Sequence, residues 1–312
     1  MNPGTLGRVA IVGAGAVGAY YGARLAQAGE DVHFLLRRDL DAVRERGLVV
    51  RVTSGTHEEF CVRPVFVAAT TAEIGPVDLV IVGLKATANN ALAQLLPPLL
   101  HARTAILTLQ NGLGSDESLA NQFGPERILG GLCFICLNRV APGEIECFYP
   151  GSLSLGEFGR ASGPRVHAIA DAWRRSGVKC LVTENLAEMR WRKLVWNVPF
   201  NGLTIAAGGV TTDKIVGDPR WLDEARALMR EIQAAAAAIG FRIPDEFLQR
   251  QIDITIPMGP YKPSSLVDYL EGRAVEVEAI WGEPLRRARA AGIAVPRLEA
   301  LHEQLRSLCR AT

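Results

Sequence analysis

Short apolar runs alternate with longer, helix-like segments in the first part of the chain. Four runs are typical of buried strands: residues 8–13, 31–36, 77–85 and 105–110. Three shorter runs predict further strands: residues 131–139, 143–148 and 152–156. A repeated order of strand, helix and strand predicts an α/β fold with a doubly wound, mainly parallel sheet and helices on both of its faces.

The pattern changes to that of helices at about residue 186. Five segments have helical periodicity: residues 187–198, 219–239, 244–251, 275–291 and 296–309. We therefore predict two domains, residues 1–185 with the sheet and residues 186–312 with helices alone. The absence of a fixed-period repeat and of a low-complexity linker favours close packing of the two.

Composition excludes several classes of protein. The 34 Lys and Arg residues nearly balance the 33 Asp and Glu residues, so charge gives no reason to expect nucleic acid or a membrane surface as a partner. No apolar stretch reaches the ~20 residues that a membrane span needs. Six cysteines in 312 residues, with no secretion signal at the N-terminus, indicate a reduced, cytoplasmic protein.

A glycine-rich motif follows the first predicted strand. Its six residues are Gly13, Ala14, Gly15, Ala16, Val17 and Gly18. The spacing G-x-G-x-x-G between a strand and a helix is typical of dinucleotide-binding Rossmann domains, in which a pyrophosphate lies at the N-terminus of the helix. The alternative is a purely structural glycine-rich turn.

The end of the second predicted strand predicts which dinucleotide binds. NAD sites usually place an acidic residue there, about 20 residues past the motif, whereas this chain has Arg37 followed by Arg38. A guanidinium suits a 2′-phosphate, so the sequence favours NADPH. The alternative is a solvated basic pair, and the nearby Asp39 would alter the local field.

Polar residues that follow apolar strands are candidates for ligand binding or catalysis, because ligands of such sheets bind beyond the carboxyl ends of the strands. Lys85 ends the run 77–85, and Asn111 follows the run 105–110. We expect them to contact nicotinamide, ribose or substrate. The alternatives are a strand-end lysine that reaches solvent and a turn residue before Gly112.

The helical half carries a second group of candidates. Lys193, Asn197 and Asn201 are four residues apart, so a continuous helix would present all three on one side. The alternative is an ordinary polar stripe. Ser264, which would otherwise cap a helix, and Glu276, otherwise a solvated carboxylate, are not singled out by spacing. The pair Cys133 and Cys136 lacks partners for zinc, and we expect no metal.

Together these segments resemble the ketopantoate reductase (2-dehydropantoate 2-reductase) family nearly from end to end. The matching segments are residues 13–18, 83–85, 110–114, 191–194 with Asn197 and Asn201, 263–264 with Asp268, 275–278 and 292–296.

The resemblance implies NADPH-dependent reduction of 2-dehydropantoate to (R)-pantoate, a step towards pantothenate and coenzyme A. It implies that Lys193 is the proton donor and that Glu276 acts with it at the catalytic centre. The residues it places on the substrate are Lys193, Asn197, Asn201, Ser264 and Asn111. Those it places on the cofactor are the glycine motif, Arg37, Lys85, Asn111 and Glu276.

Two departures from the family pattern leave alternatives open. Gly202 stands where proline is common, and a further substrate-contacting asparagine has no match at 208–211. A different 2-oxo acid is therefore the alternative substrate, and Ser265 is the alternative to Ser264. A non-catalytic NADPH sensor is a remote alternative, and a homodimer is possible on family grounds. We expect the nicotinamide to lie between the two domains.

Overall fold

The computed structural model describes residues 5–55, 57–63 and 65–310; the outer ends of the two predicted domains lie outside these ranges. The chain forms two compact units. The N-terminal unit comprises Met1–Gln110 and Ser115–Leu186, and the helical unit comprises Asn111–Gly114 and Ala187–Thr312. The sequence had assigned 111–114 to the first domain, but these residues pack with the helices of the second unit.

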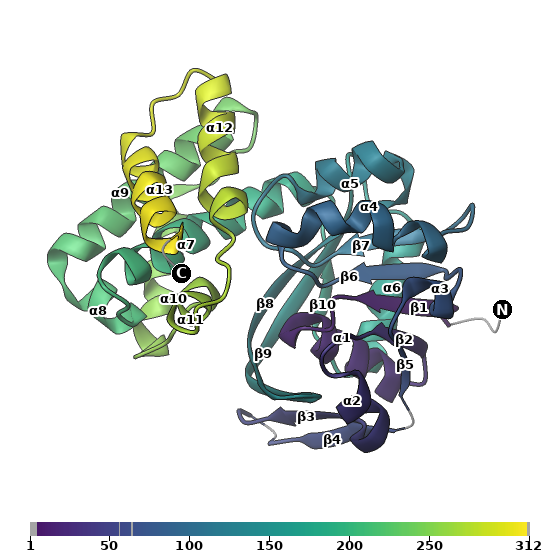
Figure 1. Ribbon diagram of the computed structural model, residues 1–312. Coiled ribbons are helices and arrows are strands. Elements are labelled where there is room, and N and C mark those ends of the chain that lie inside the picture. The colour runs from purple at the N-terminus through teal and green to yellow at the C-terminus, as the bar shows by residue number, and fades with distance from the viewer. Residues whose placement is uncertain (1–4, 56, 64, 311–312) are drawn as a thin grey trace. The chain divides into compact units, whose positions relative to one another are not determined.

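A ten-stranded sheet organises the N-terminal unit, with β4-β3-β9-β8-β7-β6-β1-β2-β5 as its order and β10 beside β9 (Figure 1). The strands are β1 (Arg8–Val12), β2 (Asp31–Leu35), β3 (Leu48–Val52), β4 (Glu59–Val62), β5 (Phe66–Ala68), β6 (Leu79–Val82), β7 (Ala105–Thr108), β8 (Ile128–Ala141), β9 (Glu144–Glu157) and β10 (Cys180–Val182). The pairs β1–β2, β1–β6, β6–β7 and β7–β8 are parallel. The predicted fold class is confirmed.

The predicted short strands at 131–139, 143–148 and 152–156 are wrong in extent. They form two long strands, β8 and β9, which pair antiparallel across a turn at Pro142 and Gly143. The register shift between Phe134 and Cys136 lies opposite residues 149–151 of β9, where the sequence pattern is interrupted between the two predicted pieces of that strand.

Both faces of this sheet are covered, as the alternation along β1 shows. Val9 and Ile11 pack in one apolar cluster, whereas Ala10 and Val12 pack in another. Helices α1 (Ala16–Gln27) and α6 (Pro164–Arg175) contribute to the first cluster. The second cluster takes residues from α3 (Thr71–Ile74), α4 (Leu92–Leu95) and α5 (Ser115–Phe123). The remaining helix of this unit is α2 (Leu40–Arg46).

The helical unit contains no strand among its described residues. Its helices are α7 (Leu186–Ala206), α8 (Thr212–Gly217), α9 (Pro219–Ala238), α10 (Asp245–Thr255), α11 (Ser264–Leu270), α12 (Glu283–Ala290) and α13 (Pro296–Arg310). A π-helical turn, Glu278–Gly282, leads directly into α12. The apolar face of α7 lies in the core of this unit, with Trp191, Leu194 and Val198 at most 1% exposed.

Helix α7 runs through Pro199 without interruption, as a common side for its polar residues requires. Gly202, which departs from the family pattern, has a packing reason. A Cβ at this position would lie 2.7 Å from Leu301 Cδ2 and 2.9 Å from Trp281 Nε1. The Trp281 indole N–H donates to the Val198 carbonyl oxygen at 2.9 Å, so the missing side chain lets this indole reach the helix.

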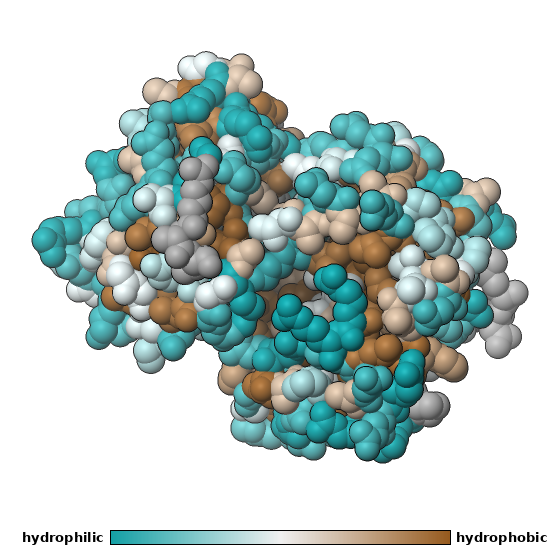
Figure 2. All heavy atoms as spheres, in the orientation of Figure 1, coloured by the Kyte–Doolittle hydropathy of each residue, from teal (hydrophilic) through white to brown (hydrophobic). Residues whose placement is uncertain are grey.

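The surface in Figure 2 mixes hydrophilic and hydrophobic residues over both units. Among the described residues, no helix has the length and apolar character to cross a membrane.

Candidate active site

The glycine motif forms the turn from β1 into α1, and its three glycines differ in what they do. Gly13 has a φ of +98°, and a Cβ there would lie 2.3 Å from the Leu84 backbone nitrogen. A Cβ at Gly18 would lie 2.2 Å from the Gly13 carbonyl oxygen. Both are therefore required by the chain's own packing.

Gly15 is different, because packing does not require it. It is exposed at the N-cap of α1, and a Cβ there would meet no atom within 4 Å. Open space in front of the free N–H groups of a twelve-residue helix is what an approaching phosphate needs. The turn formed by Gly13, Ala14, Gly15, Ala16, Val17 and Gly18 thus fits a dinucleotide pyrophosphate.

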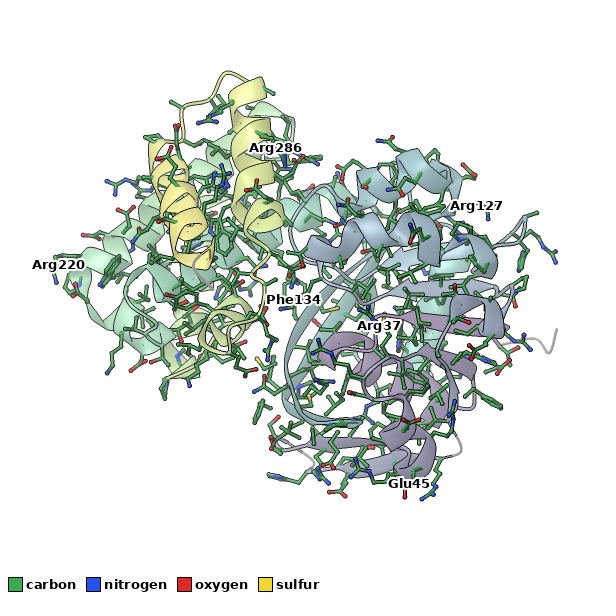
Figure 3. All side chains as sticks on the ribbon, in the orientation of Figure 1. Arg37, Glu45, Arg127, Phe134, Arg220 and Arg286 are labelled. Carbon is green, nitrogen blue, oxygen red and sulfur yellow. The ribbon has the colours of Figure 1, made fainter. Side chains whose placement is uncertain are left out.

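Arg37 leaves the sheet at the same edge as this turn. Val12 pairs with Leu35 in the parallel β1–β2 ladder, so the two strands end side by side. The side chain of Arg37, labelled in Figure 3, is exposed, and no ion pair holds Arg37 or Arg38 in the part of the chain that the structure describes.

Asp39 does not compete for these arginines. Only 6% of it is exposed, and its carboxylate accepts hydrogen bonds from Arg139 Nη1 at 2.6 and 2.8 Å. The Gly143 N–H also donates to it, at 3.4 Å. A strand distant in sequence therefore neutralises the carboxylate that could have opposed a 2′-phosphate at Arg37.

Lys85 lies beyond β6, which ends at Val82, so the predicted strand 77–85 is too long. It occupies the N-cap position of a 3₁₀ turn, Ala86–Ala91. This turn supplies a polar residue that the sequence analysis missed. Asn89 Oδ1 accepts from Gln110 Nε2 at 2.7 Å, and its Nδ2 donates to Ser115 Oγ at 3.2 Å.

In the helical unit, the structure brings together two residues that are 82 positions apart. Lys193, half-buried on α7, donates from Nζ to Asn111 Oδ1 at 2.7 Å. Because residues 111–114 belong to this unit, the contact is internal to it. A primary ammonium carries three N–H donors, and Asn111 accepts one of them here.

Asn197 and Asn201 are one and two turns further along α7 and are 7% and 2% exposed. Asn201 Oδ1 accepts the backbone N–H of Ser265 at 3.0 Å, which ties α7 to the start of α11 and leaves the Nδ2 donors of Asn201. Burying carboxamides is costly unless their polar atoms find partners. The two side chains therefore bring buried amide groups to the same helix as Lys193.

Ser264 and Ser265 differ sharply in exposure. Ser264 is exposed at the first position of α11, whereas Ser265 is only 3% exposed. The N-cap of α11 is Pro263, so the reading of Ser264 as a helix cap is wrong.

Glu276 is also unlike the solvated carboxylate that spacing alone suggested. It is 9% exposed and lies just before the π turn, where its carbonyl oxygen accepts the N–H of Ile280 at 3.1 Å. A nearly buried carboxylate in the unit that carries Lys193 fits the catalytic role implied by the resemblance. Among the described residues, no group of three or more His, Cys, Asp or Glu side chains is placed to hold a metal ion.

Known proteins of one family match this chain over most of its length. Residues 9–160 match the family model for ketopantoate reductase PanE/ApbA, and residues 185–308 match the model for the C-terminal part of the same family. A 2-dehydropantoate 2-reductase of Nostoc sp. is 39% identical over 96% of this chain and 95% of its own length.

Solved structures give the same result. A crystal structure of 2-dehydropantoate 2-reductase from Geobacter metallireducens is 44% identical and matches with a TM-score of 0.93 over 98% of this chain and all of the other. D-mandelate dehydrogenase in a ternary structure with NADH and anilino(oxo)acetate matches with a TM-score of 0.85 over 97% and 99% of the two chains. At 23% identity, this second likeness shows the fold alone.

Proposed function

The chain belongs to the ketopantoate reductase family, and on that premise we propose that it reduces 2-dehydropantoate to (R)-pantoate with NADPH, on the route to pantothenate and coenzyme A. The observation that carries the proposal is the contact of Lys193 Nζ with Asn111 Oδ1 at 2.7 Å. Lys193 is the one lysine of α7, and the contact holds it beside Asn111, which the resemblance also assigns to the site. The same helix carries the buried carboxamides of Asn197 and Asn201.

We propose that the N-terminal unit binds the cofactor. The open space at Gly15 supports contact with the pyrophosphate, and the exposed Arg37 supports contact with a 2′-phosphate. Lys85, three residues beyond the end of β6, is assigned to the cofactor as well. The solved D-mandelate dehydrogenase of the same fold holds NADH. When bound, the cofactor supplies the hydride.

Lys193 is the proposed proton donor. Negative charge grows on the ketone oxygen as the hydride arrives, and an ammonium stabilises this charge more strongly than it stabilises the neutral ketone. Lys193 then donates its proton to that oxygen, a role that usually contributes ~10²–10⁴-fold. Asn111 orients the ammonium, and the buried Glu276 balances its charge.

The remaining polar groups are assigned to the substrate. Asn197 and the Nδ2 donors of Asn201 suit the carboxylate and hydroxyl oxygens of a keto acid. The difference in exposure favours Ser264 over Ser265, because a serine that is only 3% exposed has little surface to offer a ligand.

A different 2-oxo acid is the second candidate, and one observation favours it. Gly208 and Gly209 have φ values of +93° and +85° and end α7 in a left-handed turn, where the family offers an asparagine. A Cβ at Gly208 would meet no atom within 4 Å, so no side chain fills this space. A 2-oxo acid that does not need a hydrogen bond from an asparagine at this position would suit such a site.

The deciding experiment is NADPH oxidation with 2-dehydropantoate beside several smaller 2-oxo acids. We expect the highest kcat/KM for 2-dehydropantoate. A smaller acid with a higher value would transfer the assignment to that acid. NADPH binding without turnover of any 2-oxo acid would refute the reductase and favour the sensor.

A further inference from the structure

The π turn Glu278–Gly282 leaves one backbone carbonyl group without its helical donor. The Glu283 N–H donates to the Glu278 carbonyl oxygen, five residues back. The next donor in this register, for the Ala279 carbonyl oxygen, would be residue 284. That residue is Pro284, which has no N–H.

The loop that carries Asn111 takes up this carbonyl group. The Leu113 N–H donates to the Ala279 carbonyl oxygen at 2.9 Å, and the Leu113 side chain is 5% exposed within the core of the helical unit. Buried backbone groups need such partners, so the bond serves both segments.

Gly112 allows the close approach. Its φ is +81°, and a Cβ there would lie 2.2 Å from the Ala279 carbonyl oxygen and 2.4 Å from the carbonyl carbon. Any other residue would have to move the loop away from the π turn. Asn111, directly before it, reaches Lys193 from the loop held in this way.

We infer that the π turn is a positioning device for the proton donor, and that Pro284 and Gly112 are its positioning residues. By withholding an N–H, Pro284 reserves the Ala279 carbonyl oxygen for Leu113. The bond fixes the loop, and the loop fixes Asn111 against Lys193. Glu276, whose carbonyl oxygen accepts from Ile280 in the same turn, is placed by the same backbone. The inference rests on the proposed role of Lys193.

The test restores the missing donor with Pro284→Ala. An alanine N–H at this position extends the π ladder onto the Ala279 carbonyl oxygen and competes with Leu113. We expect the Leu113 amide to lose its protection from hydrogen exchange. We also expect kcat to fall about 10-fold or more, because small misplacements of reacting groups are costly, with little change in the KM for NADPH. Pro219→Ala, at the start of α9, is the matched control and should change neither quantity.

A double-mutant cycle separates positioning from general damage. If Pro284 acts through Asn111, Pro284→Ala should lower kcat far less in an Asn111→Ala background than in the unaltered enzyme. Additive losses of kcat, accompanied by a lower Tm, would show a purely structural role and overturn the inference. So would an unchanged kcat together with an unchanged exchange rate at Leu113.

Gly112→Ala provides a second, independent approach if Pro284→Ala does not fold. Its Cβ pushes the loop off the π turn, and its effect on kcat should likewise vanish when Asn111 is alanine. Failure of the proposed function looks different: Lys193→Ala would then keep a near-normal kcat, while the exchange rate of the Leu113 amide would still report whether the π turn holds the loop.

Discussion

Replacement of Arg37 by alanine tests the cofactor assignment most directly. The structure leaves this side chain exposed, with no ion pair among the described residues, and engages the neighbouring Asp39 with Arg139. Arg37 is therefore available to a 2′-phosphate, and its removal gives up a charge-assisted contact without breaking an internal one.

The magnitude follows from that exposure. A hydrogen bond to a charged group contributes about 1.5–3 kcal/mol. Solvent and salt screen exposed charges, so the lower end of this range applies at Arg37. Since 1.4 kcal/mol corresponds to a factor of ten, Arg37→Ala should raise the KM for NADPH about 10-fold. The KM for NADH, which lacks the 2′-phosphate, should stay the same, and kcat should change little with either cofactor.

The assay is steady-state kinetics with both cofactors at low and at physiological salt. Arg44→Ala is a suitable control, because Arg44 is an exposed arginine on α2 that pairs with Asp41. Arg38→Ala shows whether the second arginine shares the contact. Equal kcat/KM values for NADPH and NADH in the unaltered enzyme would refute the reasoning. An unchanged KM for NADPH in Arg37→Ala would clear Arg37 of the role.

Three further predictions concern the proton donor and the stability of the N-terminal unit. Lys193→Ala should lower kcat ~10²-fold or more while NADPH binding, measured by fluorescence titration, persists; a near-normal kcat would remove Lys193 from the mechanism. Burial acts to raise the pKa of Glu157, but hydrogen bonds from Arg165 and Arg160 outweigh it and hold that pKa below its ordinary value. Glu157→Gln should therefore lower the Tm at neutral pH, and the difference should shrink as the pH falls below about 4.5 and the carboxylate takes up its proton; a difference that is independent of pH would contradict this. Gly22→Ala would put a Cβ 2.6 Å from Phe34 Cε1 and 2.8 Å from Ile11 Cγ1, so thermal unfolding should show a loss of about 1–3 kcal/mol, and an unchanged Tm would mean that this part of the core can yield.

The sequence was most informative where a local pattern has one structural solution. The glycine motif between a strand and a helix predicted the turn from β1 into α1. A φ of +98° at Gly13 favours glycine, and a Cβ at Gly18 would collide with the Gly13 carbonyl oxygen. The predicted helix 187–198 ended before Asn201, so Lys193, Asn197 and Asn201 would share one side only if the helix continued. It does continue, because α7 contains all three. The roles of these residues remain predictions.

Features that depend on backbone pairing were not visible in the sequence. The segments of β8 and β9 looked like short strands because periodicity reports exposure, which the bulges interrupt, and not hydrogen-bond partners. The serine next to Ser264 turned out to hold Asn201 through its backbone N–H, an atom that every residue except proline has.

Asn111 shows most clearly which properties the sequence determines and which depend on the tertiary structure. Its residue type and its place after a strand are properties of the sequence, and they suffice to make it a candidate. That it belongs to the helical unit was decided only in the folded chain, by the bond from Leu113 to the Ala279 carbonyl oxygen, which Pro284 leaves open. Local patterns encode which conformations a segment can adopt, whereas the choice of partner depends on which distant backbone groups still lack one.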